Sequence, residues 1–309
     1  MLDFAIIGGG PAGLTAGLYA TRGGLKDVVM FEKGLPGGQI TQSSEIENYP
    51  GQIEVVTGME LMEKWPEQCQ RFGLQHSMNE VTKLTKEGDI FTLSLINGEK
   101  IEAKSVLIAT GSVPKHANVK GEKEFFGRGV STCATCDGFF YKGKNVAVIG
   151  GGDTAVEEAI FLSNICKTVY IVHRRDEFRA SPHEVEKLNK VPNIIQILSH
   201  TTEEIIGDNS GVTGLIVKSK STNEIKTLDV LGVFVFVGRD VLNQTLIQDD
   251  GSFLCDMNSS GEVIVDLNMK TSVSGLFAAG DIRINAPKQV ICAAGDGATA
   301  GIGAIAYLQ

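Results

Sequence analysis

The sequence predicts an α/β protein built from two units of the same strand–turn–helix design. Two segments match when they are shifted by 142 residues: FAIIGGGPAG at 4–13 and VAVIGGGDTA at 146–155. Each copy is an apolar, β-branched run, then a glycine turn, then a helical pattern, at 12–22 or at 154–164. Two copies in this context indicate two Rossmann-like βαβ units, each suited to bind a dinucleotide.

Glycine is the unusual component of the chain, with 37 of 309 residues against only 8 prolines. In the nucleotide-binding turn, the first glycine permits the tight bend and the second lets the backbone approach a pyrophosphate. The third position, Gly13 in one copy and Ala155 in the other, permits close packing of helix on strand. The excess of glycine is therefore expected at sites where a ligand or another segment comes close.

Composition excludes several functional classes. The net charge of −9 argues against a nucleic-acid-binding surface, which needs clustered lysine and arginine. Six cysteines in 309 residues are too sparse for a disulfide framework, and the N-terminus lacks the pattern of a signal peptide. The apolar stretch 290–308 contains Asp296 and suits a buried helix better than a membrane span. We expect a soluble cytoplasmic protein of two domains.

The residue that follows the second strand of each unit should meet the adenosine ribose. In the first unit VVMF runs into Glu32, whose carboxylate can accept hydrogen bonds from ribose hydroxyls. The shift of 142 places Arg174 of HRRDEFR at the corresponding point, with Arg175 and Arg179 close by. These forked donors suit a 2′-phosphate, so the second site should prefer NADPH to NADH.

A redox pair is expected between the two nucleotide motifs, where Cys133 and Cys136 stand in CxxC spacing and Asp137 follows. This spacing supports thiol–disulfide exchange beside a dinucleotide fold. The alternatives are a zinc site, for which the sequence offers no matching second pair of ligands, and two unconnected buried thiols. We expect no metal. A flavin can link a hydride donor to a disulfide, so FAD is the cofactor expected at the first site.

The motifs of the chain, taken together, resemble those of a known protein family. The motifs GGGPAG, GGQITQSSEIENYPG, ATG, CATCDGFF, GGGDTAVEEA, HRRDEFR and FAAGDI, in this order over essentially the whole chain, are similar to those of bacterial low-molecular-weight NADPH:thioredoxin reductases. The resemblance implies electron transfer from NADPH to FAD, to the disulfide and then to thioredoxin, in a homodimer. It also implies that Cys136 faces the flavin, that Cys133 attacks thioredoxin and that Asp137 is an acid, although Asp137 could instead cap a helix.

The cofactor-binding residues expected from the motifs and the resemblance fall into two sets. The FAD set is Gly8, Gly10, Pro11, Ala12, Gly13, Glu32, Lys33, Gly34, Leu35, Pro36, Gly37, Gly38, Gln39, Ile40, Asn48, Gly280, Asp281, Lys288, Gln289 and Val290. The NADPH set is Gly150, Gly152, Asp153, Thr154, His173, Arg174, Arg175 and Arg179.

Two further features are interpreted through the family. Arg128, Phe139 and Phe140 match positions at which the family docks thioredoxin, although ordinary packing would equally explain the two phenylalanines. Where the family commonly has RQA near the flavin, this chain has Lys288, Gln289 and Val290, so a planar guanidinium is replaced by an ammonium group.

The order of the motifs predicts a discontinuous architecture. Residues 1–114 and 242–309 would form the FAD-binding domain, and residues 115–241 an inserted NADPH-binding domain that carries the CxxC pair. Because the nicotinamide and the disulfide must both reach one flavin, we expect the inserted domain to rotate about the segments 111–114 and 237–240. Two alternative functions are a reductase of another dithiol protein and a redox sensor without catalytic turnover.

Overall fold

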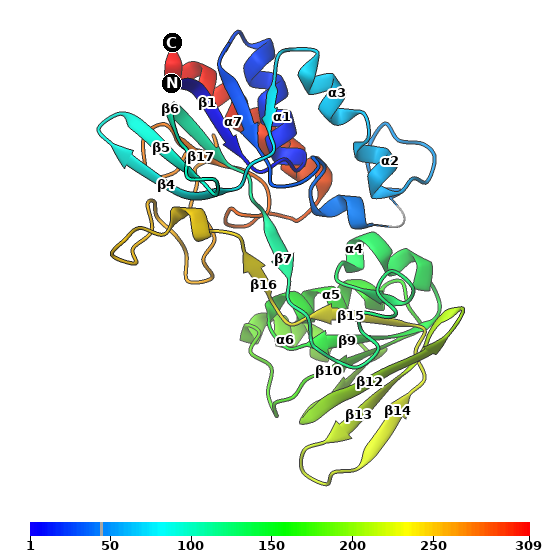
Figure 1. The fold of residues 1–309 in the computed structure, drawn as a ribbon. Helices are drawn as coiled ribbons and strands as arrows, with labels where there is room; N and C mark the ends of the chain where they lie inside the picture. The colour runs from blue at the N-terminus through cyan, green and yellow to red at the C-terminus, as the bar shows by residue number, and fades with distance from the viewer. Residues whose placement is uncertain (44–45) are drawn as a thin grey trace. The chain divides into compact units, whose positions relative to one another are not determined.

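The computed structural model describes residues 1–43 and 46–309, so Ser44 and Glu45 of the GGQITQSSEIENYPG motif lie outside the described residues. The chain forms two compact units (Figure 1). Unit 1 consists of residues 1–113 and 241–309, and unit 2 consists of residues 114–240. The two domain boundaries expected from the sequence, after residues 114 and 241, each lie one residue further along the chain than the boundaries between these units. The predicted α/β fold, with one parallel-sheet unit inserted into another, is confirmed.

Unit 1 is built on a seven-stranded sheet of order β3-β2-β1-β6-β5-β4, in which β17 also pairs with β6. Strands β1, β2, β3, β6 and β17 run parallel, and β4 and β5 are antiparallel to their neighbours. The strands are β1 (Leu2–Ile7), β2 (Val28–Phe31), β3 (Gln75–Ser77), β4 (Val81–Glu87), β5 (Ile90–Leu95), β6 (Lys100–Ile108) and β17 (Leu276–Ala278). The helices are α1 (Pro11–Arg22), α2 (Gly58–Met62), α3 (Trp65–Gln70) and α7 (Val290–Leu308), with short 3₁₀ helices at Gln39–Gln42 and Gln244–Leu246.

Alternating side chains of β1 divide the core of unit 1 into two layers. Phe4 and Ile6 pack with the helices α1 and α7, whereas Ala5 and Ile7 pack in a second cluster with residues of β4 and β5. This is the alternation expected of a buried strand. The core therefore fixes the carboxyl end of β1, where the first glycine turn begins.

Helix α7 lies against α1 through small residues. A Cβ atom on Gly297 would come within 2.1 Å of the Ala12 carbonyl oxygen, and one on Gly301 within 2.7 Å of the Ala16 carbonyl oxygen. Within residues 1–43 and 46–309, α7 is the one helix long and apolar enough to cross a membrane. Because its glycine face is buried against α1, the packing supports the expectation of a core helix.

Unit 2 repeats this design with a separate antiparallel layer. Its parallel sheet has the order β11-β10-β9-β15-β8, and a second sheet has the order β12-β13-β14. The strands are β8 (Val130–Ser131), β9 (Asn145–Gly150), β10 (Thr168–Val172), β11 (Ile194–Ile197), β12 (His200–Asp208), β13 (Gly211–Ser219), β14 (Ile225–Leu228) and β15 (Gly232–Phe236). The helices are α4 (Ala134–Asp137), α5 (Asp153–Ser163) and α6 (Pro182–Asn189), with a 3₁₀ helix at Gly138–Tyr141.

The parallel sheet of unit 2 is buried on both faces. Val146 and Val148 of β9 pack in a cluster with α5, whereas Ala147 and Ile149 pack with residues of the β12-β13-β14 sheet. The two segments that join the units are β7 (Ser112–Pro114) and β16 (Arg239–Val241), which pair as a two-stranded sheet.

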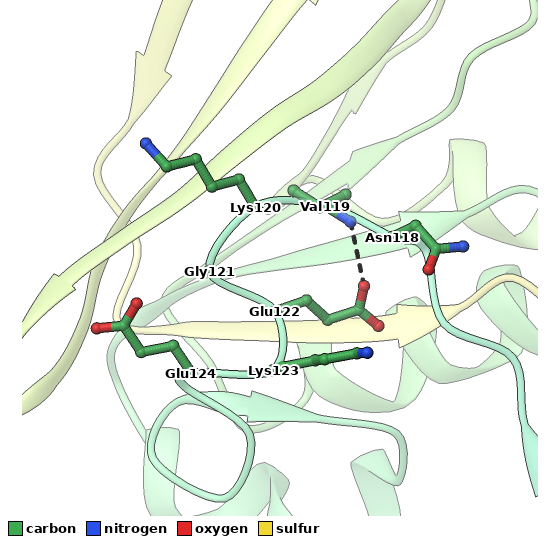
Figure 2. A pocket seen from close by; sticks show the side chains of 7 residues that line it. All are labelled: Asn118, Val119, Lys120, Gly121, Glu122, Lys123 and Glu124. Atoms are coloured by element: carbon green, nitrogen blue, oxygen red, sulfur yellow. Dashed lines mark hydrogen bonds between the residues drawn. The ribbon is translucent and has the colours of Figure 1, made fainter.

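A loop of unit 2 is fastened by a buried carboxylate. Glu122 is 3% exposed and accepts hydrogen bonds from the amides of Ala117 (3.1 Å) and Val119 (3.2 Å). His116 Nδ1 lies 3.1 Å from the same carboxylate. The surface pocket beside this loop is lined by residues 118–124, and Figure 2 shows the Glu122 side chain turned toward Val119. None of the expected nucleotide-binding or disulfide residues lines this pocket, so we assign it no part in the candidate functional site.

Candidate functional site

The first glycine turn is shaped by close backbone contacts in unit 1. Gly8 has a φ of 109°, and a Cβ atom there would come within 2.4 Å of the Ala109 carbonyl oxygen. At Gly13, a Cβ atom would come within 1.9 Å of the Gly8 carbonyl oxygen. These positions therefore require glycine, because α1 begins directly against the end of β1.

The Glu32 carboxylate lies directly behind this turn. Its Oε2 accepts a hydrogen bond from the Gly9 amide (2.8 Å) and its Oε1 accepts one from the Gly34 amide (3.2 Å). The Gly37 amide donates to the Gly9 carbonyl (2.8 Å), and a Cβ atom on Gly38 would lie 2.8 Å from Gly10 Cα. The expected FAD segment 32–38 is thus folded against the first glycine turn, and Glu32 stands at the end of β2 as predicted.

Gly280 and Asn48 contact the segments at which α1 and α7 begin. A Cβ atom on Gly280 would lie 3.1 Å from the Cβ of Ala12 and 3.6 Å from the Cβ of Ala293. The Asn48 side-chain amide donates to Gln289 Oε1 (3.2 Å), which links the expected residue 48 to the residue before α7. The structure therefore brings the first glycine turn into contact with the segment after β2 and with Gly280, and it separately links Asn48 to Gln289.

Lys288, which stands where the family commonly has an arginine, has an unusual local structure. Its φ is 58°, in the left-handed region that few non-glycine residues adopt. Its ammonium group donates to the Ala286 carbonyl (3.0 Å). The positive charge is therefore tied to the backbone of its own loop.

The second glycine turn, in unit 2, has the same design. A Cβ atom on Gly150 would come within 2.4 Å of the Phe236 carbonyl oxygen and within 2.6 Å of the Ala155 Cβ. The Arg179 amide donates to the Gly151 carbonyl (2.6 Å), much as Gly37 does to Gly9 in unit 1. The segment that contains the arginines is therefore folded over the turn.

The register of β10 corrects the sequence alignment of the two units. In unit 1, Ile7 of β1 pairs with Phe31, whereas in unit 2 Ile149 of β9 pairs with Val172. The partner follows 24 residues later in the first case and 23 residues later in the second. The shift of 142 therefore fails after the helix, because α5 has 11 residues where α1 has 12. His173, and not Arg174, takes the place of Glu32.

The side-chain contacts of His173 agree with this register. A Cβ atom on Gly9 would meet the Glu32 side chain at 3.0 Å, and one on Gly151 would meet the His173 ring at 2.3 Å. His173 is 7% exposed and its ring stacks on Phe178, with centroids 5.8 Å apart. Burial, together with the nearby guanidinium groups, holds the pKa of His173 below its ordinary value. The imidazole is therefore uncharged at neutral pH.

The other expected NADPH residues lie at the surface around the turn. Arg174, Arg175 and Arg179 are exposed, so their guanidinium groups are accessible to a ligand. The Asp153 carboxylate accepts a hydrogen bond from the Ser181 amide (2.7 Å), and Thr154 is exposed beside it. Three exposed guanidinium groups in one short segment are chemically suited to an anion.

One glycine in each turn is explained by neither crowding nor backbone strain. Gly10 and Gly152 precede α1 and α5 with φ values of −76° and −95°, which any residue adopts. A Cβ atom on Gly10 would meet Gly38 Cα alone, at 3.7 Å, and one on Gly152 would meet no atom of the described residues within 4 Å. Open space over a glycine at a helix N-terminus is what a pyrophosphate needs. Both turns therefore fit a dinucleotide.

The CxxC pair is a disulfide in unit 2. Cys133 and Cys136 are bonded, with Cα atoms 5.3 Å apart, at the start of α4. The Cys136 amide donates to Cys133 Sγ (3.2 Å), and Ser131 Oγ accepts from the Cys133 amide (3.0 Å). Cys136 is exposed and Cys133 is partly buried. Asp137 is the last residue of α4, and its amide donates to the Cys133 carbonyl (3.2 Å).

The disulfide and the second glycine turn lie at the same edge of the parallel sheet. The disulfide follows β8 and the turn follows β9, and β15 pairs in parallel with both strands. Parallel strands place their carboxyl ends at one edge, which is where ligands bind in open α/β sheets. Unit 2 therefore carries a redox pair and a nucleotide turn after two strands that run in the same direction and are separated by β15.

Three of the four remaining cysteines are buried. These are Cys69, Cys166 and Cys255, whereas Cys292 is partly buried. Burial raises the pKa of Cys69 and of Cys166 to about 11 and that of Cys255 to about 12. Thiols with such pKa values carry little thiolate at neutral pH, so these three are poor nucleophiles.

Sequence reasoning missed two supports of the site. Ser131 caps the Cys133 amide, and the signal was a serine two residues before the first cysteine. In unit 1, Arg283 Nε and Nη2 donate to the two Asp296 carboxylate oxygens (2.7 and 2.9 Å). The signal for this pair was a carboxylate within an otherwise apolar helix, which needs a partner when it is buried.

Comparison with known proteins agrees with this geometry. A family model described as "Pyridine nucleotide-disulphide oxidoreductase" matches residues 2–297. A thioredoxin reductase from Helicobacter pylori is 60% identical over 100% of this chain and 99% of its own length, and one from Peptoclostridium acidaminophilum is 42% identical over 99% and 97%. The crystal structure of thioredoxin reductase from Streptococcus pyogenes is similar with a TM-score of 0.91 and 38% identity, over 100% of this chain and 98% of that one. The chain therefore belongs to the pyridine nucleotide–disulphide oxidoreductase family, in the group of its thioredoxin reductase relatives.

Proposed function

We propose that the protein is an NADPH-dependent thioredoxin reductase, with FAD bound by unit 1 and NADPH by unit 2. The observation that carries the proposal is the Cys133–Cys136 disulfide at the same sheet edge as the second glycine turn. The similarity to thioredoxin reductases over the whole chain supports the choice of substrate. When bound, FAD supplies the chemistry that accepts a hydride from nicotinamide and passes two electrons to a disulfide.

The residues of unit 1 would hold FAD by its adenosine and pyrophosphate. The start of α1 at Gly10 offers backbone amides to the pyrophosphate, and the Glu32 carboxylate offers acceptors to the ribose hydroxyls. Gly280 and Asp281 would contribute from the turn after β17 and Gln289 from the residue before α7, with Asn48 hydrogen-bonded to Gln289. A carboxylate at the ribose would disfavour a phosphate there, which supports FAD rather than NADPH in this unit.

The residues of unit 2 would hold NADPH. The start of α5 at Gly152 would take the pyrophosphate, and Arg174, Arg175 and Arg179 would bind the 2′-phosphate with charge-assisted hydrogen bonds.

The reduced cysteine pair would transfer two electrons to thioredoxin by thiol–disulfide exchange. The Cys133 thiolate attacks one sulfur of the thioredoxin disulfide, and the displaced sulfur leaves as a thiolate that takes up a proton. The Cys136 thiolate then attacks Cys133 Sγ, re-forms the internal disulfide and releases the second thioredoxin thiol. The Cys136 amide, which donates to Cys133 Sγ in the disulfide form, would stabilise the negative charge of a Cys133 thiolate. Asp137 would supply a proton to a departing thiolate.

Thioredoxin would dock on exposed aromatic and basic side chains near the disulfide. Phe139 is 62% exposed and Phe140 is 36% exposed, which weakens the alternative that they are ordinary core residues. Arg128 is exposed, and its guanidinium lies 5.8 Å from the Phe125 ring centroid. Large apolar side chains left at the surface are typical of a binding site for another protein.

Rotation of unit 2 about the two joining segments remains part of this proposal. Gly111 and Gly238, next to β7 and β16, have φ values of 73° and 113°, which suit glycine. Glycines at such positions allow the backbone to change direction. A homodimer and a cytoplasmic location also remain proposals, and light scattering of the purified protein tests the first.

The test combines a spectrum with turnover. The purified protein should show flavin absorbance that NADPH bleaches faster than NADH, and it should oxidise NADPH rapidly when thioredoxin is added. Cys136→Ser should keep the flavin and its bleaching but lose thioredoxin reduction. Cys69→Ser, at a buried thiol that bonds to the Leu14 carbonyl, is the matched control and should keep full turnover.

Three outcomes would contradict the proposal in different ways. Turnover with a peroxiredoxin-type or glutaredoxin-like partner, but not with thioredoxin, would favour the reductase of another dithiol protein. Flavin bleaching without turnover of any disulfide protein would favour the redox sensor. Full reductase activity in Cys136→Ser would refute the assigned disulfide chemistry.

A further inference from the structure

We infer that Glu122 is a positioning residue for electron transfer between the two units, which acts by fixing the backbone of residues 116–119 where the chain enters unit 2. The inference rests on the proposed function, because it concerns the proposed rotation of unit 2 about the joining segments. It assigns a role to a buried carboxylate that lies outside the expected nucleotide and disulfide residues.

The Glu122 carboxylate binds the segment of chain that follows β7. Its Oε1 accepts the Ala117 amide and lies 3.1 Å from His116 Nδ1. Its Oε2 accepts the Val119 amide, as Figure 2 shows. Residues 115–119 belong to no helix or strand, so this one side chain supplies acceptors that a neighbouring strand would otherwise provide. Hydrogen bonds to a charged acceptor are among the stronger ones in proteins, so the carboxylate is a firm local anchor.

The far end of this loop is fixed to β12. The Lys120 carbonyl accepts the Ile205 amide (2.8 Å), and the Lys120 ammonium group lies 2.7 Å from the Glu204 carboxylate. A Cβ atom on Gly121 would come within 2.1 Å of the Ile205 carbonyl oxygen, so the loop backbone lies directly against the strand. Val119 packs in the buried cluster that contains residues of β9 and β12. Residues 116–121 are therefore held to the core of unit 2.

The chain just before this loop is held less firmly. Lys115 donates its amide to the Gly238 carbonyl (2.9 Å), next to β16. Its ammonium group lies 3.1 Å from the Asp240 carboxylate, and the two side chains are 48% and 60% exposed. Exposed ion pairs contribute little to stability. The change from a weakly held to a firmly held backbone therefore falls between Lys115 and His116.

This boundary matters for the proposed rotation. With residues 116–119 fixed, changes of φ and ψ in the joining segments 111–114 and 237–240 turn unit 2 as one body. With those residues loose, part of the movement would be taken up by the loop, and the nicotinamide and the disulfide would reach the flavin at scattered positions. A misplacement of about 1 Å can slow a reaction about a hundredfold. Glu122 therefore acts through position, without contact with a reacting atom.

The test compares steps between the units with steps within unit 2, in the flavin-loaded protein. Flavin bleaching by NADPH and turnover with thioredoxin need both units. Binding of NADP⁺, followed by calorimetry, needs unit 2. So does reduction of thioredoxin by protein whose Cys133–Cys136 disulfide has first been reduced to two thiols with dithiothreitol, because those thiols pass their two electrons directly to the thioredoxin disulfide.

Glu122→Gln replaces one acceptor oxygen by an NH₂ donor, and Glu124→Gln makes the same change at an exposed residue of the same loop (Figure 2). We expect Glu122→Gln to slow flavin bleaching and thioredoxin turnover by about tenfold, because the flavin is met at scattered positions. The two steps within unit 2 should keep their wild-type values. Hydrogen exchange should quicken at residues 116–119 and stay unchanged in β9 and β10. Glu124→Gln should match wild type throughout.

The outcomes separate this inference from the proposed function. Wild-type protein whose flavin is not bleached by NADPH would overturn the proposed function itself. Wild-type bleaching and turnover in Glu122→Gln, despite faster exchange at residues 116–119, would overturn the role of Glu122 alone. An equal loss in the steps within unit 2 would also overturn it, because the carboxylate would then support the fold of unit 2 in general. If Glu122→Gln does not fold, His116→Ala removes one contact of the carboxylate at a side chain that is 52% exposed. The same split, smaller in size, is then expected, and its absence overturns the inference.

Discussion

The partly buried Arg283 and the buried Asp296 form an ion pair with two hydrogen bonds, Nε to Oδ2 at 2.7 Å and Nη2 to Oδ1 at 2.9 Å. The same Oδ2 accepts the Gly280 amide at 3.1 Å. The pair therefore joins α7 to the turn after β17, where Gly280 precedes Asp281. Since both residues of that turn belong to the proposed FAD site, the ion pair is placed to hold the flavin-binding backbone.

We predict that Asp296→Asn destabilises unit 1 and weakens flavin retention. The substitution leaves the partly buried Arg283 guanidinium without its counter-charge, which should cost about 2–3 kcal/mol of unfolding free energy. Urea unfolding measures the loss, and ultrafiltration measures free FAD. The control is Asp208→Asn, at a carboxylate that accepts a hydrogen bond from Ser210 in an exposed turn of unit 2. Equal flavin retention in Asp296→Asn and in wild type would show that the pair does not support the FAD site.

A second prediction concerns the close contact of α1 with β1. Gly13→Ala should destabilise unit 1 by about 3 kcal/mol, because its Cβ would lie 1.9 Å from a backbone oxygen that cannot move aside. Gly295→Ala in α7 is the control: its Cβ would meet no atom of the described residues within 4 Å. That substitution should stabilise the helix by roughly 0.5–1 kcal/mol. Opposite shifts in the thermal unfolding midpoint are expected, and a neutral Gly13→Ala would contradict the reason given for this glycine.

The fold and the glycine turns could be predicted because their signals are local. A β-branched run, a glycine turn and a helical pattern each specify backbone conformation within a few residues, and both copies carry all three. The position of Glu32 was predictable for the same reason, since it directly follows the strand β2. The disulfide was also predictable, because CxxC spacing brings the two sulfurs together within one turn of helix.

The position of His173 could not be predicted because it depends on a length. The glycine motif fixes where α5 begins, but neither the end of a helix nor the following loop is specified by that motif. One residue fewer between β9 and β10 moves His173 into the place of Glu32. The Arg283–Asp296 pair was hidden for a similar reason: the lone carboxylate of the apolar helix was visible, but its partner depends on how the turn after β17 folds.

The third prediction concerns the choice of coenzyme. Changing Arg174 or Arg175 to glutamine should raise the KM for NADPH by about tenfold or more, because each charge-assisted hydrogen bond contributes roughly 1.5–3 kcal/mol. The KM for NADH should change little, since that coenzyme has no 2′-phosphate. Lys226→Gln, which removes an exposed charge on β14 of the same unit, should change neither value. Equal effects on both coenzymes would show that the arginines do not bind the phosphate.

The last prediction follows from the lowered pKa of His173, whose ordinary value is 6.5. Below about pH 6.5 the His173 side chain of the unfolded chain binds a proton. The buried ring of the folded protein, beside Arg174, Arg175 and Arg179, does not bind this proton as readily. The unfolding free energy therefore falls as the pH falls. The slope from this one group is at most about 1.4 kcal/mol per pH unit, and it ends below the folded-state pKa. His173→Gln has no titratable group at this position. Its unfolding free energy should therefore rise relative to that of wild type as the pH falls from 6.5 to 5. Between pH 7.5 and pH 8.5 the difference between the two unfolding free energies should stay constant. Urea unfolding across this range measures both curves. Parallel curves throughout would mean that His173 takes up its proton in the folded protein as readily as in the unfolded chain.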